Sequence, residues 1–203
     1  MPNYELEEKC AADRFSIVCG VDEAGRGPLS GDVYAAACVL PRGLEIPGLN
    51  DSKKLTPKKR EALFDVICEN AIAFAIASAT PEEIDELNIL GADMLAMRRA
   101  IAKLSPPADI ALIDGNIARD FPIPAYPIIK GDSLSCSIAA ASILAKVSRD
   151  RQCLLDDAAS PMYGFAKHKG YGTKEHMAAL RKYGPCPLHR RSFLRFLEKE
   201  HVD

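Results

Sequence analysis

Short apolar runs alternate along the chain with longer segments whose apolar positions recur at helical spacing. A short apolar run bounded by turn residues is typical of a buried strand, whereas recurrence every three or four residues indicates a helix. Five such runs predict strands over residues 17–21, 32–40, 71–79, 109–113 and 125–129. Strands that are separated by helices in this way indicate an α/β fold.

Helix signals fill the segments around these strands. The segment 56–70 opens on Thr-Pro, a typical helix start, and predicts a helix that buries Leu63, Val66 and Ile67. Residues 80–83, TPEE, form a capping box that opens a short helix. Further helices are predicted over about 91–104 and 137–151, after an N-cap at Thr173, and over about 191–200.

The predicted sheet is mixed. A hairpin is expected between the first two strands, the first three strands are expected to be antiparallel, and the last two are reached through helices. The helix over 137–151 carries a face of small residues, AAAS at 139–142, which suits close packing on the sheet. Because no repeat or low-complexity linker interrupts the 203 residues, a single domain over 1–203 is expected.

The composition is that of a globular protein with a core of its own, since 48% of the residues are hydrophobic and 27% are charged. No apolar run approaches the roughly 18 residues of a membrane span, and the acidic first ten residues have no signal-peptide core. The seven cysteines are scattered, without a C-x-x-C pair. We therefore expect reduced thiols in a cytoplasmic protein, which argues against a structural zinc site.

Charge is distributed unevenly, although the net charge is only -2. From Lys146 to Arg195 there are 11 Lys and Arg against 4 Asp and Glu, a net of +7, so the remainder carries -9. An acidic front and a basic rear fit a metal site beside a surface that follows phosphates. A solvated helical surface that happens to be basic is the alternative.

Four carboxylates stand at or just beyond the ends of predicted strands, namely Asp22, Glu23, Asp114 and Asp132. Neighbouring strands lie about 4.8 Å apart, so these side chains can converge, and convergent carboxylates without matching bases need a cation. Oxygen ligands select Mg²⁺ or Mn²⁺ rather than zinc. Two such ions about 4 Å apart can activate a water and stabilise the leaving oxygen of a phosphodiester.

A Gly-Arg-Gly-Pro segment, residues 25–28, follows the first strand. Two glycines that flank an arginine let the backbone approach a ligand closely with a guanidinium beside it, which suits phosphate or ribose. An ordinary Gly-Pro turn after an acidic strand end is the alternative.

Six segments taken together resemble bacterial ribonuclease HII, of the type 2 ribonuclease H family. They are GVDEAGRGPLSG (20–31), NDSKKL (50–55), LIDGN (112–116), KGDSLSCSIAAASILAKVSRDR (130–151), HKGYGTKEH (168–176) and HRRSF (189–193). The resemblance follows the chain order over nearly its whole length. It implies a ribonuclease-H-like mixed five-stranded sheet flanked by helices, with a helical C-terminal extension over about 160–203 that completes the substrate cleft.

The resemblance implies an endonuclease, dependent on Mg²⁺ or Mn²⁺, that cleaves the RNA strand of RNA–DNA hybrids. It also implies incision on the 5′ side of single ribonucleotides in duplex DNA, which leaves a 3′-hydroxyl and a 5′-phosphate. The catalytic and metal-binding residues that it implies are Asp22, Glu23, Asp114 and Asp132. The implied grip on the ribonucleotide and its phosphate is Gly25, Arg26 and Gly27, whose backbone groups would read the 2′-hydroxyl.

Other substrate contacts also follow from the resemblance. Tyr171 matches a tyrosine that stacks on the deoxyribose after the ribonucleotide, although the residues alone favour a tyrosine that anchors a Gly-rich loop. Lys53 and Lys54 resemble phosphate contacts, although a bare pair of lysines is usually a solvated surface. Further phosphate contacts are expected around the long helix from Ser133, Ser135, Lys146 and Arg149.

The chain departs from the family pattern at Ser30-Gly31-Asp32, where Ala-Gly-Pro is common. Asp32 either weakens substrate binding slightly or pairs with a nearby lysine. Asp150 fits an ion-pair cluster better than a metal site, and the four histidines (168, 176, 189 and 201) are expected to be structural or to contact phosphate. We expect a monomer, and no glutamine-aromatic motif for a sliding clamp stands near the C-terminus.

Two functions of other classes compete with this interpretation. A nucleic-acid-binding protein could keep the fold without catalysis, but a lost enzyme would usually miss one of the four carboxylates. A metal-dependent phosphohydrolase could act on small nucleotides, but it would not require the long basic segment. Hybrid retention without cleavage would indicate the binding protein, and turnover of free nucleotides would indicate the phosphohydrolase.

Overall fold

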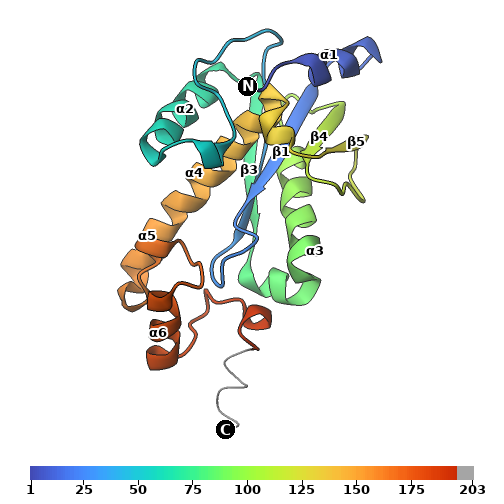
Figure 1. The fold of residues 1–203 in the computed structure, drawn as a ribbon. Helices are drawn as coiled ribbons and strands as arrows, with labels where there is room; N and C mark the ends of the chain where they lie inside the picture. Colours follow the sequence, from blue (N-terminus) through green and yellow to red (C-terminus); the bar gives the residue numbers. More distant parts are fainter. Residues whose placement is uncertain (196–203) are drawn as a thin grey trace.

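The computed structural model describes residues 1–195 and shows a five-stranded mixed sheet flanked by helices (Figure 1). Its strands are β1 (Val18–Ala24), β2 (Val33–Val39), β3 (Ala73–Ala79), β4 (Ile110–Asp114) and β5 (Ala125–Ile128). The order across the sheet is β3-β2-β1-β4-β5. The pairs β1–β2 and β2–β3 are antiparallel, whereas β1–β4 and β4–β5 are parallel. The predicted mixed sheet and its first hairpin are thus confirmed.

The helices include those that the sequence signals predict. They are α1 (Glu5–Ala12), α2 (Pro57–Asn70), α3 (Pro81–Ala102), α4 (Cys136–Ala159), α5 (Phe165–His168) and α6 (Lys174–Tyr183), with single 3₁₀ turns η1 (Ser52–Lys54), η2 (Gly131–Ser133), η3 (Pro161–Tyr163) and η4 (Arg191–Phe193). The side chains of Thr56, Thr80 and Thr173 each cap a helix N-terminus. Asn88 has a φ of 59°, so α3 consists of the two consecutive helices that the sequence predicts.

One face of the sheet is covered by α4, which runs along β1 (Figure 1). The small residues 139–142 of α4 are buried. A Cβ on Gly20 of β1 would lie only 2.2 Å from the backbone nitrogen of Ile138, so strand and helix are in backbone contact there. Glycine on the strand and alanine on the helix permit this approach, which holds α4 beside the carboxyl end of β1.

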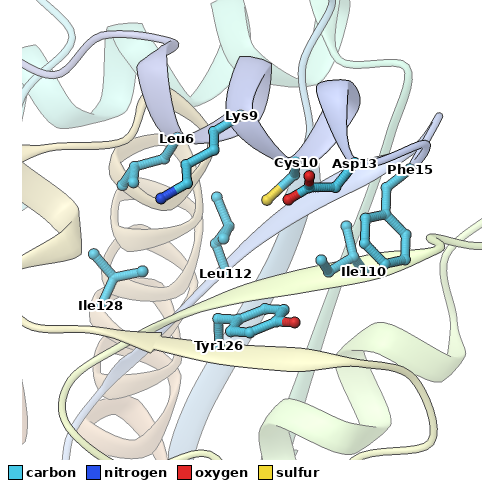
Figure 2. A pocket seen from close by; sticks show the side chains of 9 residues that line it. All are labelled: Leu6, Lys9, Cys10, Asp13, Phe15, Ile110, Leu112, Tyr126 and Ile128. Atoms are coloured by element: carbon cyan, nitrogen blue, oxygen red, sulfur yellow. The ribbon is translucent and has the colours of Figure 1, made fainter.

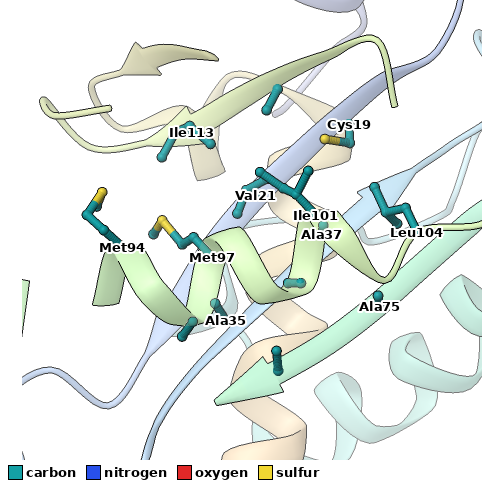
Figure 3. Close-up of a cluster of buried hydrophobic side chains, with 14 of the residues drawn as sticks. Cys19, Val21, Ala35, Ala37, Ala75, Met94, Met97, Ile101, Leu104 and Ile113 are labelled. Atoms are coloured by element: carbon teal, nitrogen blue, oxygen red, sulfur yellow. The ribbon is translucent and has the colours of Figure 1, made fainter. Parts of the chain in front are cut away.

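The opposite face is covered by α3. Cys19 and Val21 of β1 pack there with Met97 and Ile101, and Ile113 of β4 belongs to the same core (Figure 3). Successive side chains of a strand point to opposite faces. Residues 19 and 21 therefore face α3, and the alternation puts Asp22 on the α4 side and Glu23 on the α3 side.

The apolar pattern does not predict α1, which packs across the sheet near β4 and β5. Buried Glu7 of α1 accepts hydrogen bonds from Ser135 Oγ (2.6 Å) and from the backbone N–H of Ser137 (2.9 Å), so α1 is anchored to the start of α4. Ser135 also caps α4 and is fully buried. An apolar pocket of about 210 Å³ lies between α1 and the strands β4 and β5 (Figure 2).

The segment from η3 to η4 is bound to the loop that follows β1. The backbone N–H of Leu29 donates to Gly170 O (2.8 Å), and that of Gly31 donates to Leu188 O (2.8 Å). In the other direction, the backbone N–H of Arg190 donates to Leu29 O (2.9 Å). These bonds fix the Gly-Arg-Gly loop against residues that follow it by about 140 positions or more.

Some boundaries differ from the expectation. Val66 is 36% exposed, whereas Leu63 and Ile67 of α2 are buried as predicted. The helix predicted over 137–151 extends to Ala159. Where a helix is predicted over 191–200, residues 191–193 form the 3₁₀ turn η4, and residues 196–200 lie outside the described residues. Within residues 1–195, no helix has both the length and the apolar character that a membrane crossing requires.

Candidate active site

Three carboxylates meet at one edge of the sheet, on its α4 side. Oxygen atoms of Asp22, Asp114 and Asp132 lie within 4.8 Å of one another. The parallel register aligns Val21 with Ile113, so the next residues, Asp22 and Asp114, stand side by side where β1 and β4 end. Asp132 comes from η2, immediately after β5, which completes the convergence that the sequence predicts for these three residues.

The cluster is buried, and its acidic side chains lie close enough to repel one another. Burial, together with the charges of Glu23 and Asp114, raises the pKa of Asp22 well above its usual range. Burial and the charge of Asp132 raise the pKa of Asp114 as well. Clustered carboxylates resist ionisation in this way when no cation lies between them.

The donor set fits a hard divalent cation. Asp22 and Asp132 are buried and Asp114 is partly buried, so the three side chains present oxygen atoms in a confined space. All three ligands are oxygen donors, which suits Mg²⁺ or Mn²⁺ and does not suit zinc in a thiolate or imidazole site. A divalent cation between the three groups would offset the repulsion that raises the pKa values of Asp22 and Asp114.

Glu23 is not part of this cluster, although the sequence analysis places it there. It follows Asp22 on β1 and therefore points to the α3 side. Its Oε1 lies 3.6 Å from Arg26 NH1. The structure thus brings together three of the four predicted carboxylates and holds Glu23 next to the arginine of the Gly-Arg-Gly loop.

The Gly-Arg-Gly loop has a backbone that requires glycine at its first position. Gly25 has a φ of +103°, and a Cβ there would lie 2.2 Å from Arg149 Nε. Arg149 is itself buried and donates to Lys169 O (2.8 Å). Arg149 nevertheless belongs to the lining of the adjoining pocket, so its contact with phosphate stays a prediction.

A second buried arginine holds the same loop. Arg190 donates from NH2 to Gly25 O (2.7 Å), from NH1 to Pro28 O (2.8 Å) and to Arg26 O (3.1 Å), and from Nε to Gly31 O (2.9 Å). Burial and the neighbouring charge of Arg149 lower the pKa of Arg190 to about 9. With its carbonyl groups bound by Arg190, the loop is fixed in one conformation.

A pocket of about 210 Å³ gathers most of the remaining predicted residues. Those that line it are Glu23, Gly25, Arg26, Gly27, Lys53, Lys146, Arg149 and Tyr171. The pocket therefore joins the end of β1 to η1, α4 and the loop after α5. Its lining combines exposed cationic side chains with glycine backbone and one aromatic ring.

Tyr171 forms one wall of this pocket. Its side chain is 47% exposed, and Cε1 lies 3.4 Å from the position that a Cβ on Gly27 would occupy. Its backbone N–H donates to His168 O (3.0 Å), so the main chain rather than the phenol anchors this loop. The ring is left free to contact a ligand.

Lys53 and Lys54 stand beside the carboxylate cluster, on η1. Lys53 Nζ lies 3.5 Å from Asp132 Oδ2, and Lys54 Nζ donates to Ser133 Oγ over 3.1 Å. Burial lowers the pKa of Lys53, but the charges of Asp22 and Asp132 outweigh it and leave that pKa raised. Lys53 therefore remains cationic next to the predicted metal site.

Several secondary expectations have a definite outcome. Ser135 is a buried cap and does not face a phosphate. Lys146 pairs with Asp150, which also lies 3.7 Å from Arg60, so the ion-pair interpretation of Asp150 is confirmed. Asp32 accepts a hydrogen bond from Ser78 Oγ (2.7 Å) and faces no lysine within ion-pair distance in the described part of the chain.

The three histidines that the structure describes have structural roles. His168, His176 and His189 are buried, with ring contacts to one another and to Phe165. His201 lies outside the described residues.

Two buried residues at the site have no role in the sequence analysis. Arg190 belongs to the HRRSF segment, which the family resemblance includes without a role. Asp93 is fully buried on α3, 3.6 Å from Arg26 Nε. The available signal for Asp93 is its place one turn before the core residue Met97, on the buried face of an apolar helix.

Comparison with known proteins agrees with this geometry. A family model described as ribonuclease HII matches residues 19–196. Ribonuclease HII 1 of Methylibium petroleiphilum is 57% identical over 179 residues, which are 88% of this chain and 90% of that protein. Ribonuclease HII of Caldicellulosiruptor saccharolyticus is 52% identical over 95% of this chain and 94% of that protein.

The fold is also similar to that of a solved structure. Ribonuclease H2 from Pyrococcus horikoshii superposes with a TM-score of 0.70 at 26% sequence identity, over 87% of this chain and 93% of that chain. The chain therefore belongs to the ribonuclease HII family and is a divalent-metal-dependent ribonuclease H, an endonuclease that acts on RNA–DNA hybrids.

Proposed function

We propose that this enzyme recognises the junction at a single ribonucleotide in duplex DNA and cleaves the phosphodiester on its 5′ side, leaving a 3′-hydroxyl and a 5′-phosphate. One observation carries the proposal: the carboxylate cluster of Asp22, Asp114 and Asp132 lies beside a pocket whose walls are the Gly-Arg-Gly loop and Tyr171. Hydrolysis and ribose recognition would thus take place at neighbouring positions.

Asp22, Asp114 and Asp132 would hold the divalent cation, with Glu23 as a further ligand in the proposal. Bound there, Mg²⁺ or Mn²⁺ would supply an activated water and stabilise charge on the leaving oxygen. Glu23 now pairs with Arg26, so it would have to turn away from that guanidinium to reach the cation. Lys53, beside Asp132, would bind the negative phosphate that approaches the cluster.

The rigid Gly-Arg-Gly loop would read the ribose. Arg190 binds the carbonyl oxygens of Gly25, Arg26 and Pro28, which leaves the opposite side of that peptide backbone for the pocket. A 2′-hydroxyl can both donate and accept hydrogen bonds, and it is the group that distinguishes RNA from DNA. Backbone amides fixed in this way would recognise it without an ordering cost at each encounter.

Tyr171 would decide which nucleotide follows the ribonucleotide. Its free ring faces Gly27 across the pocket, so a sugar bound there would pack on the ring face. An added 2′-hydroxyl would be brought against the ring without a hydrogen-bond partner, which disfavours ribose at this position. A preference for an RNA-to-DNA junction follows.

The other parts of the proposal concern the assembly. The segment 160–203, bound to the loop after β1, would complete the substrate cleft of a single 203-residue unit that acts as a monomer. All seven cysteines are free, which suits the reducing cytoplasm. A sliding-clamp motif is not expected near the C-terminus, where residues 196–203 lie outside the described residues.

The test is cleavage of a labelled DNA duplex that carries one ribonucleotide, with Mg²⁺, Mn²⁺ or a chelator. An all-DNA duplex of the same sequence is the matched control. The expected product is a nick just 5′ of the ribonucleotide, with either metal and not with the chelator. Cleavage of a long hybrid without a junction nick would remove the junction role, and retention of both duplexes without cleavage would indicate a binding protein.

A further inference from the structure

The buried carboxylate of Asp93 has no hydrogen-bond partner. Neither of its oxygen atoms is exposed, and neither accepts a hydrogen bond. A buried polar group in this condition is costly and requires an explanation. Burial and the nearby charge of Glu23, opposed by Arg26, raise the pKa of Asp93 to about 8.

The one cation within ion-pair distance of Asp93 in the described residues is Arg26. Asp93 Oδ2 lies 3.6 Å from Arg26 Nε, and Glu23 Oε1 lies 3.6 Å from Arg26 NH1. Glu23 and Asp93 therefore flank the guanidinium on two sides, although the arginine side chain is 48% exposed. An arginine with this exposure and no such contacts would sample many rotamers.

The position of Asp93 explains how it reaches this arginine. Glu23 points to the α3 side of β1, and Asp93 projects from the half of α3 that follows the break at Asn88. Residues around it, such as Ala92 and Ala96, belong to the core against the sheet. Asp93 thus projects from a helix packed in the core, whereas Arg26 lines a pocket that is open to solvent.

We infer that Asp93 is a positioning residue for substrate binding, which holds the guanidinium of Arg26 at the wall of the ribonucleotide pocket before the substrate arrives. The inference rests on the proposed contact of Arg26 with the substrate. A side chain that is already ordered loses less entropy on binding, so we expect loss of Asp93 to weaken the binding affinity for the substrate. Catalytic turnover depends on the carboxylate cluster, which lies on the opposite face of β1.

The decisive experiment is a double-mutant cycle on Asp93→Asn and Arg26→Ala. Binding of a labelled duplex with one ribonucleotide is measured by fluorescence anisotropy in the presence of a chelator, and KM and kcat are measured with Mg²⁺. We expect Asp93→Asn to raise both Kd and KM about three- to tenfold, the range for ordering one long side chain. kcat should stay within about twofold, and Asp93→Asn should add nothing in the Arg26→Ala background.

Controls separate this effect from a loss of folding. Asp93→Asn removes no hydrogen bond and should melt at or above the wild-type temperature, and Asp93→Ala provides a second variant of the same position. Thr80→Ala, which removes the N-cap of the same helix, should lower the melting temperature without changing Kd.

Two sets of outcomes would overturn different claims. An unchanged or lower Kd in Asp93→Asn, or an equal effect of that substitution with and without Arg26, would reject the positioning role. A wild-type Kd in Arg26→Ala would instead reject the proposed substrate contact of Arg26 itself. The failure of the inference and the failure of the proposed function are therefore distinguishable.

Discussion

The backbone N–H of Asp132 donates to Asp114 Oδ1 over 3.3 Å, and this bond links the turn after β5 to the end of β4. The bond positions two of the three clustered carboxylates, because the backbone of Asp132 orients the side chain of Asp114. A carboxylate cluster held by the main chain is ready for a cation before the cation binds. The same geometry brings buried negative charges close together, so they repel one another.

Replacement of Asp22 by Asn should therefore separate stability from activity. Burial and like charge raise the pKa of Asp22, so its ionised form destabilises the metal-free fold at pH 7. Asn can still accept the hydrogen bond from the backbone N–H of Glu23 (2.7 Å). In a chelator, Asp22→Asn should raise the free energy of unfolding by about 1 to 3 kcal/mol, while cleavage with Mg²⁺ falls at least about a thousandfold.

Chemical denaturation and hybrid cleavage measure these two quantities, and Asp114→Asn should behave in the same direction. Binding of the hybrid should largely persist in both variants. Cleavage at the wild-type rate in either variant would contradict the metal-site assignment, whatever the change in stability.

Replacement of Lys53 by Ala should weaken binding of all substrates together. Lys53 stands 3.5 Å from Asp132, and its charge is available to any phosphate that approaches the cluster. A single phosphate contact contributes about one unit to the salt dependence of binding. We expect Kd to rise for long hybrids and junction duplexes alike, with the slope of log Kd against log salt reduced by about one.

Lys103→Ala is the matched control for this prediction, because Lys103 is an exposed cation at the end of α3, away from the pocket. It should leave the slope unchanged. An unaltered slope in Lys53→Ala would show that Lys53 does not contact phosphate and acts only as a counter-charge for Asp132.

The sequence predicts the strands, the mixed sheet and the meeting of Asp22, Asp114 and Asp132, because strand ends in one sheet are adjacent wherever the helices lie. Grouping Glu23 with these three overlooks that adjacent residues of one strand point to opposite faces, so Asp22 and Glu23 do not share a side of the sheet. The sequence predicts no role for Arg190, because its burial depends on a loop distant in sequence and composition favours an exposed position for an arginine. The helical pattern places Asp93 on a buried face, but it does not show that this carboxylate meets Arg26.

Replacement of Tyr171 by Ala should remove junction selectivity more than cleavage itself. The main chain of residue 171 holds the loop, so the substitution leaves the hydrogen bonds to His168 and His176 in place. A ring contact of about 1.4 kcal/mol corresponds to a tenfold effect. Incision at a single ribonucleotide should therefore fall about tenfold relative to cleavage within a long hybrid, and Tyr171→Phe should retain the wild-type ratio.

Tyr126→Ala provides the comparison, since Tyr126 is an exposed tyrosine on β5 that lines the other pocket. It should change neither rate. Equal losses on both substrates in Tyr171→Ala would indicate a tyrosine that only supports the loop.

Stability should fall as the pH drops from about 6.5 toward 4, because buried His176 and His189 are held as neutral tautomers. His176 Nδ1–H donates to Tyr171 O (3.0 Å), so its Nε2 accepts from His189 Nε2–H (3.0 Å), and His189 Nδ1 accepts from the backbone N–H of Cys186 (3.0 Å). A proton on His176 would bring its Nε2–H against the Nε2–H of His189, and a proton on His189 would bring its Nδ1–H against the N–H of Cys186. Burial and the neighbouring His176 lower the pKa of His189 to about 4.

The sign follows from proton binding. An unfolded chain binds a proton at each histidine below pH 6.5, whereas folded His189 binds none until about pH 4, so the unfolded state gains stability over this interval. The loss for His189 should approach about 3 kcal/mol. His189→Asn keeps an acceptor for Cys186 without the titration, so the stability difference between wild type and variant should shrink between pH 6.5 and 4, as measured by urea unfolding. A difference that stays constant across this interval would show that His189 titrates normally in the fold and that acid unfolding begins elsewhere.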